Sequence, residues 1–249
     1  MTETRTSLPT AHPATTRAII VSHGQPSDQD PAEAALANLA ANVAKLMPGW
    51  TVTSATLAAT GALDTAVEKV GPNALVYPLF MTDGWFTQIT LPKRLNGRYA
   101  QILPPLGTEP TLPDLVHGWL MDELRQRGWT PQETSLILAS HGSGKSREPA
   151  RGTERFAAAL AARCTFGELR IGYIEEPPFL GDMAFGLPGR SVCLPFFAAA
   201  GGHVSDDLPE ALDMADFRGL RLPPIGTHPG VPAVIVASLL GQARKMTAK

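Results

Sequence analysis

The feature that most limits the possible folds of this chain is an internal repeat. A Ser-His-Gly motif at residues 22–24 recurs at residues 140–142, an offset of 118 (140 − 22). The segment Leu-Pro-Pro-Leu-Gly-Thr-Glu-Pro at residues 103–110 recurs as Leu-Pro-Pro-Ile-Gly-Thr-His-Pro at residues 222–229, an offset of 119 (222 − 103). Offsets this similar, from opposite ends of the repeated unit, indicate that the 249 residues form two similar units in tandem.

Each half alternates short apolar runs with amphipathic segments, which is typical of strands alternating with helices. In the first half we predict strands at residues 17–22, 50–58, 74–80 and 99–103, and helices at 30–47, 63–70 and 113–127. In the second half we predict strands at residues 135–140, 169–174, 191–197 and near 220, and helices at 149–163, 179–185, from 206 and from 231. This order favours an α/β fold with two tandem similar domains, residues 17–128 and 129–249, each a small parallel sheet flanked by helices.

The composition argues against several classes of protein. With a formal net charge of −2 and a pI of about 6.3, the chain is not expected to bind nucleic acid or anionic membranes. No apolar run approaches the roughly 18 residues that a membrane-spanning helix needs. Residues 1–16 are rich in Thr and Pro and predict a disordered tail, not a secretory signal, so we expect a soluble, cytoplasmic protein. Cys164 and Cys193 lack paired spacing, which predicts buried, reduced thiols.

One stretch of the second half joins a predicted strand to a candidate metal ligand. The apolar run at residues 191–197 leads through small residues to Gly201, Gly202 and His203, before a polar segment that can start a helix. The paired glycines let the backbone take positive φ and leave space beside the imidazole for a flat or bulky ligand. His141 follows another apolar run. Both imidazoles are therefore predicted at the carboxyl edge of one parallel sheet, where α/β proteins bind ligands.

Two imidazoles and a carboxylate suit a divalent first-row metal. His141, Glu175 and His203 are expected at the ends of three strands of the second half. We interpret these three residues as a metal site with an open coordination position, from which the metal can leave again. Register with the repeat favours Glu175, and the adjacent Glu176 remains an alternative.

The first half lacks this set of ligands. His23 matches the first histidine, but Phe86 and Ala58 stand opposite the second histidine and the glutamate when the repeats are superposed. We therefore predict a degenerate site in residues 17–128 and the metal site in residues 129–249. The sequence leaves open whether His23 contributes to a cleft between the two domains.

At these residues the chain resembles the class II chelatases, the sirohydrochlorin cobaltochelatases and ferrochelatases of the CbiX and SirB type. Those proteins have an apolar strand ending in His-Gly-Ser, a strand ending in a Leu-Glu-like pair, and a Pro-Leu-Phe strand that leads to Gly-Gly-His-Val. Here the motifs read Ser140-His141-Gly142-Ser143, Ile174-Glu175, and Pro195-Phe196-Phe197 followed by Gly201-Gly202-His203-Val204 and Asp207-Leu208-Pro209. The likeness is close in the second half and looser in the first, and the Gly-Gly-His block is its specific part.

The resemblance implies two chelatase-like domains with an active cleft between them. It also implies insertion of Co²⁺ or Fe²⁺ into a carboxylate-rich tetrapyrrole such as sirohydrochlorin, without ATP, for cobalamin or siroheme biosynthesis. The metal would be a substrate, with no tightly bound cofactor, and the protein a monomer or homodimer. His141 and His203 would be metal ligands, and Glu175 would act in deprotonation or metal handling. In two-domain members the competent site usually lies in the first half, which Ala58 and Phe86 disable here.

Several residues near the two histidines are candidates for binding the tetrapyrrole. Lys145, Arg147 and Arg151 follow His141 and suit the carboxylates of such a substrate, while a solvated helix start explains each of them equally well. The residues that we assign to substrate binding are Ser143, Lys145, Arg147, Gly201 and Gly202.

Two other functions agree with parts of the sequence. Residues 139–146, Ala-Ser-His-Gly-Ser-Gly-Lys-Ser, satisfy a relaxed phosphate-loop pattern directly after a predicted strand. A phosphate loop also needs a second strand that ends in Asp to hold Mg²⁺, whereas the run at 191–197 ends in Phe, and Pro149 hinders a continuous helix from the loop. A non-catalytic carrier of a tetrapyrrole or a metal would use the same fold and ligands without turnover.

Overall fold

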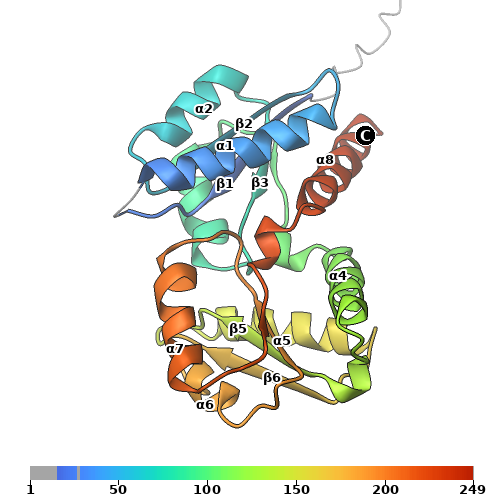
Figure 1. Cartoon of the computed structure of the whole chain (residues 1–249). Helices are drawn as coiled ribbons and strands as arrows, with labels where there is room; N and C mark the ends of the chain where they lie inside the picture. The colour runs from blue at the N-terminus through green and yellow to red at the C-terminus, as the bar shows by residue number, and fades with distance from the viewer. Residues whose placement is uncertain (1–15, 27–28, 249) are drawn as a thin grey trace, which may run out of the picture.

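The computed structural model describes residues 16–26 and 29–248, and these form two four-stranded parallel sheets with helices around them (Figure 1). The first sheet has the order β2-β1-β3-β4, and the second has the equivalent order β6-β5-β7-β8. The strands are β1 (Arg17–Ser22), β2 (Thr51–Thr56), β3 (Leu75–Pro78), β4 (Gln101–Ile102), β5 (Ser135–Ser140), β6 (Glu168–Tyr173), β7 (Ser191–Pro195) and β8 (Leu220–Arg221). The helices are α1 (Gln29–Lys45), α2 (Ala62–Val70), α3 (Leu91–Leu95), α4 (Leu112–Gln126), α5 (Glu148–Ala161), α6 (Leu180–Ala184), α7 (Leu208–Met214) and α8 (Val231–Thr247). The predicted α/β fold class is confirmed.

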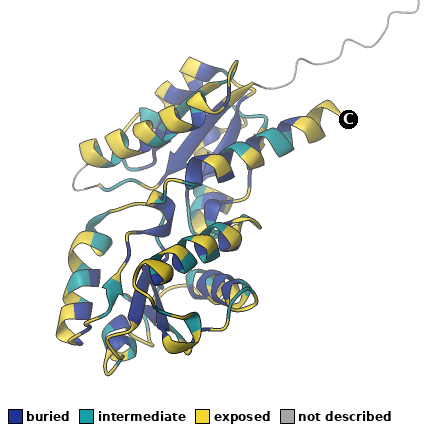
Figure 2. Cartoon of the chain, turned by 45° about the vertical axis from the view of Figure 1, so that its right-hand side comes forward, coloured by how far each residue is buried: buried dark blue, intermediate teal, exposed yellow. Residues whose placement is uncertain are grey.

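The central strands show why each sheet is covered on both faces. Successive side chains of a strand point to opposite faces, so an unbroken apolar run needs apolar partners on both. In β1, Ile20 packs into one core cluster and Ile19 into another. In β5, Leu138 and Ile137 divide between two clusters in the same way. Figure 2 shows the strands buried between helices whose outer faces are exposed.

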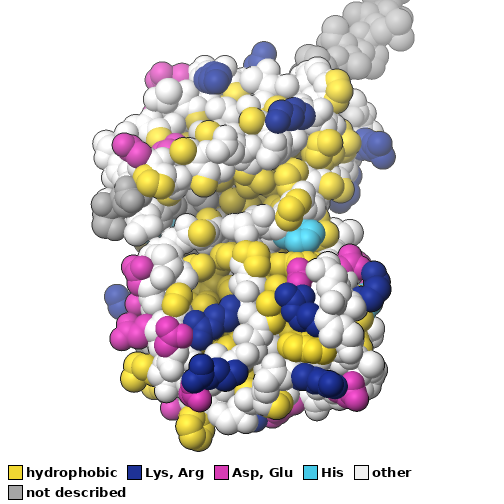
Figure 3. All heavy atoms as spheres, in the orientation of Figure 1, with side chains coloured by type: hydrophobic (Ala, Val, Ile, Leu, Met, Phe, Trp, Pro, Cys, Tyr) yellow, Lys and Arg dark blue, Asp and Glu magenta, His cyan; other side chains and the backbone are white. Residues whose placement is uncertain are grey.

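The last helix of each half packs against the other half. Helix α8 contacts α1 and β3 of the first half, whereas α4 contacts α5 of the second half (Figure 1). An ion pair joins α4 to the end of α5, with Nε of Arg163 2.6 Å from Oδ1 of Asp114. One continuous core cluster therefore contains side chains from both sheets, and hydrophobic side chains are visible where the two halves meet (Figure 3).

This exchange of helices bears on the boundary predicted between residues 128 and 129. In sequence, the boundary lies between the two sheets, but α8 packs against α1 and β3 of the first half, and α4 packs against α5 of the second half. The division into residues 17–128 and 129–249 therefore remains a proposal about the sequence repeat. The units that pack in space combine residues from both repeats.

Each half also contains a helical segment that follows its third strand. A π-helical turn at Phe86–Thr90 leads into α3, and the equivalent turn at His203–Asp207 leads into α7. The first of these segments was absent from the predicted elements, and the second begins earlier than the predicted start near residue 206. Because π-helical turns are frequent at functional sites, the residues of these two turns are candidates for a functional role.

Three further expectations concern the termini, the membrane and the cysteines. The predicted tail at residues 1–16 lies outside the described residues except for Thr16, whose carbonyl accepts a hydrogen bond of 2.9 Å from the N–H of Thr51. Within the described ranges, no helix is both long and apolar enough to cross a membrane. Cys164 and Cys193 are free thiols, but only Cys193 is buried as predicted, whereas Cys164 is partly exposed. Burial raises the pKa of Cys193 to about 12, so this thiol stays protonated near neutral pH.

Candidate metal centre

The loop after β5 holds His141 in a backbone conformation that requires glycine at the next position. Gly142 has φ of +71°, and a Cβ atom on it would lie 2.8 Å from Cγ of Glu176 and 2.9 Å from Cβ of Tyr173. Only glycine adopts this φ without strain and fits this space. The hydroxyls of Ser140 and Thr153 hydrogen-bond at 2.8 Å and tie the end of β5 to α5. The Ser-His-Gly motif is therefore a structural requirement for presenting the imidazole at the end of the strand.

The His141 ring is oriented by its own loop. Its Nδ1 donates a hydrogen bond of 2.9 Å to the carbonyl of Gly142, which can only accept. In the neutral imidazole, Nδ1 therefore carries the hydrogen and Nε2 has the lone pair that a metal can bind. This Nε2 atom lies 3.7 Å from Oε1 of Glu175.

His203 reaches the site from a helical turn and not from the end of a strand. Strand β7 ends at Pro195, and His203 is the first residue of the π-turn that precedes α7. Gly202 has φ of −49°, and neither Gly201 nor Gly202 has a positive φ, so the turn does not use the backbone freedom that the paired glycines allow. A Cβ on Gly202 would lie 3.3 Å from Nε2 of Gln25, so the absence of a side chain lets a residue of the first half approach the turn.

A carboxylate orients the His203 ring. Nδ1 of His203 lies 2.5 Å from Oδ2 of Asp207, at the other end of the same π-turn. Because a carboxylate accepts, Nδ1 is the donor, and in the neutral imidazole Nε2 has the lone pair that a metal can bind. Ligating histidines commonly donate the other ring N–H to a carboxylate in this way. The sequence analysis included Asp207 in the motif that carried the resemblance but assigned it no role. The sequence feature that could have indicated its role is its position four residues after His203.

The three predicted ligands lie together in the folded chain. One ligand atom from each of His141, Glu175 and His203 lies within 4.8 Å of the others, and among the described residues no second such cluster of three or more His, Cys, Asp or Glu occurs. The two imidazole rings meet edge to face, with centroids 4.3 Å apart and an interplanar angle of 86°. The side chains are 40%, 48% and 46% exposed, so a large molecule can approach them from solvent.

The two neighbouring glutamates have different environments. The carboxylate of Glu175 is the one grouped with the histidines, and its backbone N–H donates to the carbonyl of His141 at 2.9 Å. Oε1 of Glu176 instead accepts a hydrogen bond of 2.9 Å from the N–H of Ser143, which stabilises the loop. Burial is the main cause that raises the pKa of the adjacent Tyr173 to about 12, with nearby carboxylates, including that of Glu176, acting in the same direction.

The first half reproduces this geometry without the ligands. Nδ1 of His23 donates to the carbonyl of Gly24 at 2.8 Å, as its counterpart does in the second half. Phe86 packs edge to face on His23, with ring centroids 4.5 Å apart and an angle of 82°. Thr90 stands opposite Asp207, and its hydroxyl oxygen is buried with no hydrogen-bond partner among the described residues. The first half thus has the backbone arrangement of the metal site but lacks the side chains that could bind a metal.

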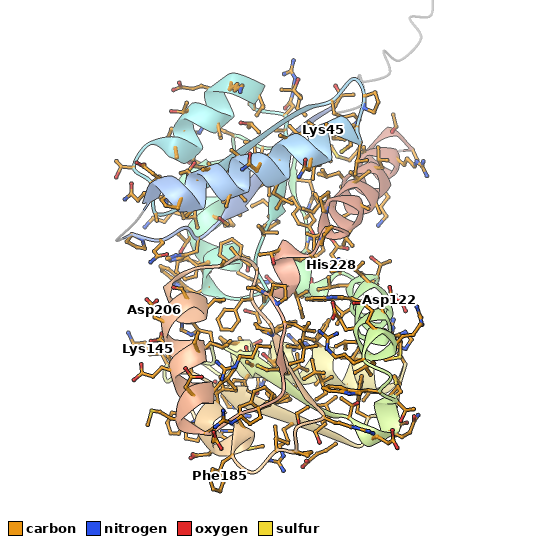
Figure 4. The ribbon with its side chains drawn as sticks, in the orientation of Figure 1. Lys45, Asp122, Lys145, Phe185, Asp206 and His228 are labelled. Atoms are coloured by element: carbon orange, nitrogen blue, oxygen red, sulfur yellow. The ribbon has the colours of Figure 1, made fainter. Side chains whose placement is uncertain are left out.

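The predicted tetrapyrrole-binding cations differ in their surroundings. Nη2 of Arg147 lies 3.5 Å from Oε1 of Glu154, and Nη1 of Arg151 lies 2.7 Å from Oε1 of Glu148, so both pair along the surface of α5. Lys145 is exposed, and Figure 4 shows it on the same side of the second half as Asp206. The remaining predicted residues, Ser143, Gly201 and Gly202, lie in the loops that carry the two histidines.

Two similar parallel α/β units, with a His–Glu–His group at one sheet edge, define a protein of the chelatase-like class. The chain belongs to the CbiX family, whose model matches residues 17–122 and again residues 135–241. The two matches correspond to the two sheets and confirm the resemblance inferred from the motifs. No curated protein sequence matches the chain.

Solved structures agree with this assignment. The structure of CbiX, described as the terminal enzyme for biosynthesis of siroheme in denitrifying bacteria, is 46% identical, covers 90% of this chain and 98% of its own, and has a TM-score of 0.83. SirB from Bacillus subtilis with Fe³⁺ is 16% identical, with coverage of 94% and 98% and a TM-score of 0.72. SirB from Bacillus subtilis subspecies spizizenii in complex with cobalt is 16% identical, with coverage of 92% and 96% and a TM-score of 0.65. At that identity the two SirB structures support the fold alone.

Proposed function

We propose that the protein inserts Co²⁺ or Fe²⁺ into a carboxylate-rich tetrapyrrole such as sirohydrochlorin, without ATP, as a step of cobalamin or siroheme biosynthesis. The observation that carries the proposal is the grouping of His141, Glu175 and His203 within 4.8 Å in a member of the CbiX family. The 46% identity to the CbiX described as the terminal enzyme of siroheme biosynthesis supports the class of substrate.

In this proposal the protein holds the substrate metal through few ligands. The Nε2 atoms of His141 and His203 and a carboxylate oxygen of Glu175 bind it, and the remaining coordination positions are open to ring nitrogens. A chelatase must release the metal again, so partial coordination by half-exposed side chains suits the task better than a closed structural site. The exposure of the three side chains is consistent with this requirement.

Insertion also requires two pyrrole protons to leave the macrocycle. As the metal forms bonds to the ring nitrogens, it leaves the imidazoles, whose Nε2 lone pairs become free to accept protons. Glu175 is the group next to both histidines that accepts a proton as a carboxylate, and we assign it the first deprotonation. The second proton passes to a released imidazole or to water, which balances the reaction: two protons leave as one divalent metal enters.

The phosphate-loop alternative is disfavoured by the local geometry. Helix α5 begins at Glu148, after the Gly-Lys-Ser segment, whereas a phosphate loop leads directly into its helix. The motif also contains His141, whose ring faces the second histidine. These contacts favour a metal-binding loop over one that wraps phosphates.

The experiment is anaerobic incubation of the purified chain with sirohydrochlorin and Co²⁺ or Fe²⁺, followed by absorption spectroscopy, with and without ATP. We expect metal insertion faster than in a protein-free control and no effect of ATP. A strict need for ATP would contradict the proposal in favour of nucleotide chemistry. Binding of metal and tetrapyrrole without turnover would instead identify a carrier.

A further inference from the structure

A groove of about 530 Å³ lies between the first half and helix α5 of the second half. Close packing joins the two elements beside it, because a Cβ on Gly152 of α5 would lie 2.4 Å from Cγ2 of Thr82. Helix α5 starts where the loop carrying His141 ends, so the groove lies next to that loop. The residues that line it are Asp83, Gly84, Trp85, Gln88, Ile89, Glu148 and Arg155.

One wall of the groove is apolar and open to solvent. Trp85 is 64% exposed and Ile89 is 54% exposed, which is unusual for side chains of this size. The indole of Trp85 meets the ring of Phe86 edge to face, with centroids 5.2 Å apart and an angle of 76°. The ring of Phe86 in turn contacts His23. The position that stands opposite His203 in the repeat thus supports an exposed aromatic surface.

The opposite wall carries a cation without a partner. In the described part of the chain, the guanidinium of Arg155 makes neither an ion pair nor a hydrogen bond. The acids of the groove are already engaged: Asp83 accepts hydrogen bonds from Thr87 at 2.7 Å and from Gln88 at 2.6 Å, while Glu148 pairs with Arg151. Arg155 is therefore the charged group of the groove that is available to a ligand.

We propose that this groove is a subsite for one edge of the tetrapyrrole, with Trp85 and Ile89 against the macrocycle and Arg155 paired with a peripheral carboxylate. The inference rests on the proposed function and deepens it, because it places part of the substrate's binding energy in the half that lacks metal ligands. An exposed aromatic face suits a flat conjugated ring, and a guanidinium suits a carboxylate. The volume falls within the roughly 300–1,000 Å³ typical of ligand pockets.

The test is equilibrium binding of metal-free sirohydrochlorin to the full chain, together with Co²⁺ affinity measured separately. Trp85→Ala and Arg155→Gln should each raise the Kd for sirohydrochlorin about tenfold, which is the effect expected from the loss of one aromatic or one charge-assisted contact. Both should leave the Kd for Co²⁺ within about twofold. Added salt should weaken tetrapyrrole binding by the wild type more than by Arg155→Gln, because an exposed ion pair is screened.

Two exposed residues outside the groove serve as matched controls. Phe185→Ala, on a side chain that is 72% exposed, and Arg244→Gln, near the end of α8, should bind sirohydrochlorin as the wild type does. Circular dichroism checks that all four variants are folded. Wild-type affinity in both groove variants would overturn the inference. So would a change of sedimentation with Trp85→Ala but no change in tetrapyrrole binding, which would identify a protein interface.

The two proposals fail in different ways. If the wild type inserts metal while both groove variants keep its KM for sirohydrochlorin, only the groove assignment is wrong. If the wild type binds sirohydrochlorin and the variants bind it weakly, but no metal is inserted, the groove assignment holds and the chelatase function is wrong.

Discussion

Nδ1 of His203 lies 2.5 Å from Oδ2 of Asp207, and the two residues form the ends of one π-helical turn. The equivalent turn of the first half has Phe86 and Thr90 at these positions, so it lacks both the imidazole and the carboxylate. The histidine and the acid that orients it are thus present together in one half and absent together in the other. This pairing suggests that they act as a unit.

Asp207→Ala should weaken metal binding about 10- to 100-fold, because the His203 ring loses the acceptor that selects its tautomer and direction. Asp207→Asn should be milder, since the amide oxygen still accepts a hydrogen bond. Titration with Co²⁺ measures both affinities. The adjacent and exposed Asp206→Asn is the matched control. Equal affinities for Asp207→Ala and the wild type would show that His203 does not depend on this contact.

His141→Ala and His203→Ala should each lower the insertion rate at least tenfold, because no other residue replaces the missing ligand. Glu175→Gln should slow insertion while retaining much of the metal binding, since it keeps the size of the side chain but loses its charge and basicity. His23→Ala should have a smaller effect than either second-half histidine variant. The measurement is the insertion rate, with circular dichroism to confirm folding. A loss with His23→Ala as large as with His203→Ala would indicate a site shared between the halves.

A second metal site should be obtainable in the first half by restoring the missing groups. The combined variant Ala58→Glu, Phe86→His and Thr90→Asp would surround His23 with the counterparts of the second-half residues on an equivalent backbone. We expect about two Co²⁺ per chain instead of one, measured by equilibrium dialysis and metal analysis. Phe86→His alone is the control, because it lacks the carboxylates. One Co²⁺ per folded triple-variant chain would show that the two backbones are not equivalent.

Gly142→Ala should destabilise the protein by about 1–3 kcal/mol, because alanine is strained at positive φ and its Cβ would press on Glu176 and Tyr173. Urea unfolding followed by circular dichroism measures the free energy of unfolding. Gly189→Ala is the matched control, since no atom lies within 4 Å of a Cβ at that position and its φ is ordinary. If both variants unfold alike, the backbone of the His141 loop is not constrained as described.

The sequence by itself was sufficient to predict the two parallel sheets. Strands buried on both faces appear as continuous apolar runs, and β1 and β5 occur at the residues predicted for them. The repeat then related the halves residue by residue, which showed that only the second half has His141, Glu175 and His203. The expectation that the three would meet is confirmed, but His203 reaches the site from a π-turn after β7 and not, as predicted, from the end of a strand. Their roles as ligands and catalytic groups stay predictions.

The features that depend on contacts between residues distant in sequence were determined only by the tertiary structure. The exchange of α4 and α8 follows from packing against the opposite half, which the periodicity of a helix does not report. Arg147 forms an ion pair with Glu154, and Arg151 forms one with Glu148. These ion pairs, like the separate environments of the two neighbouring glutamates at 175 and 176, depend on where each side chain points. A sequence pattern records which residues are apolar and how they are spaced. The direction of a side chain and its partners across the chain are set only when the elements pack, and this is why the orientation of the candidate ligands emerged from the structure alone.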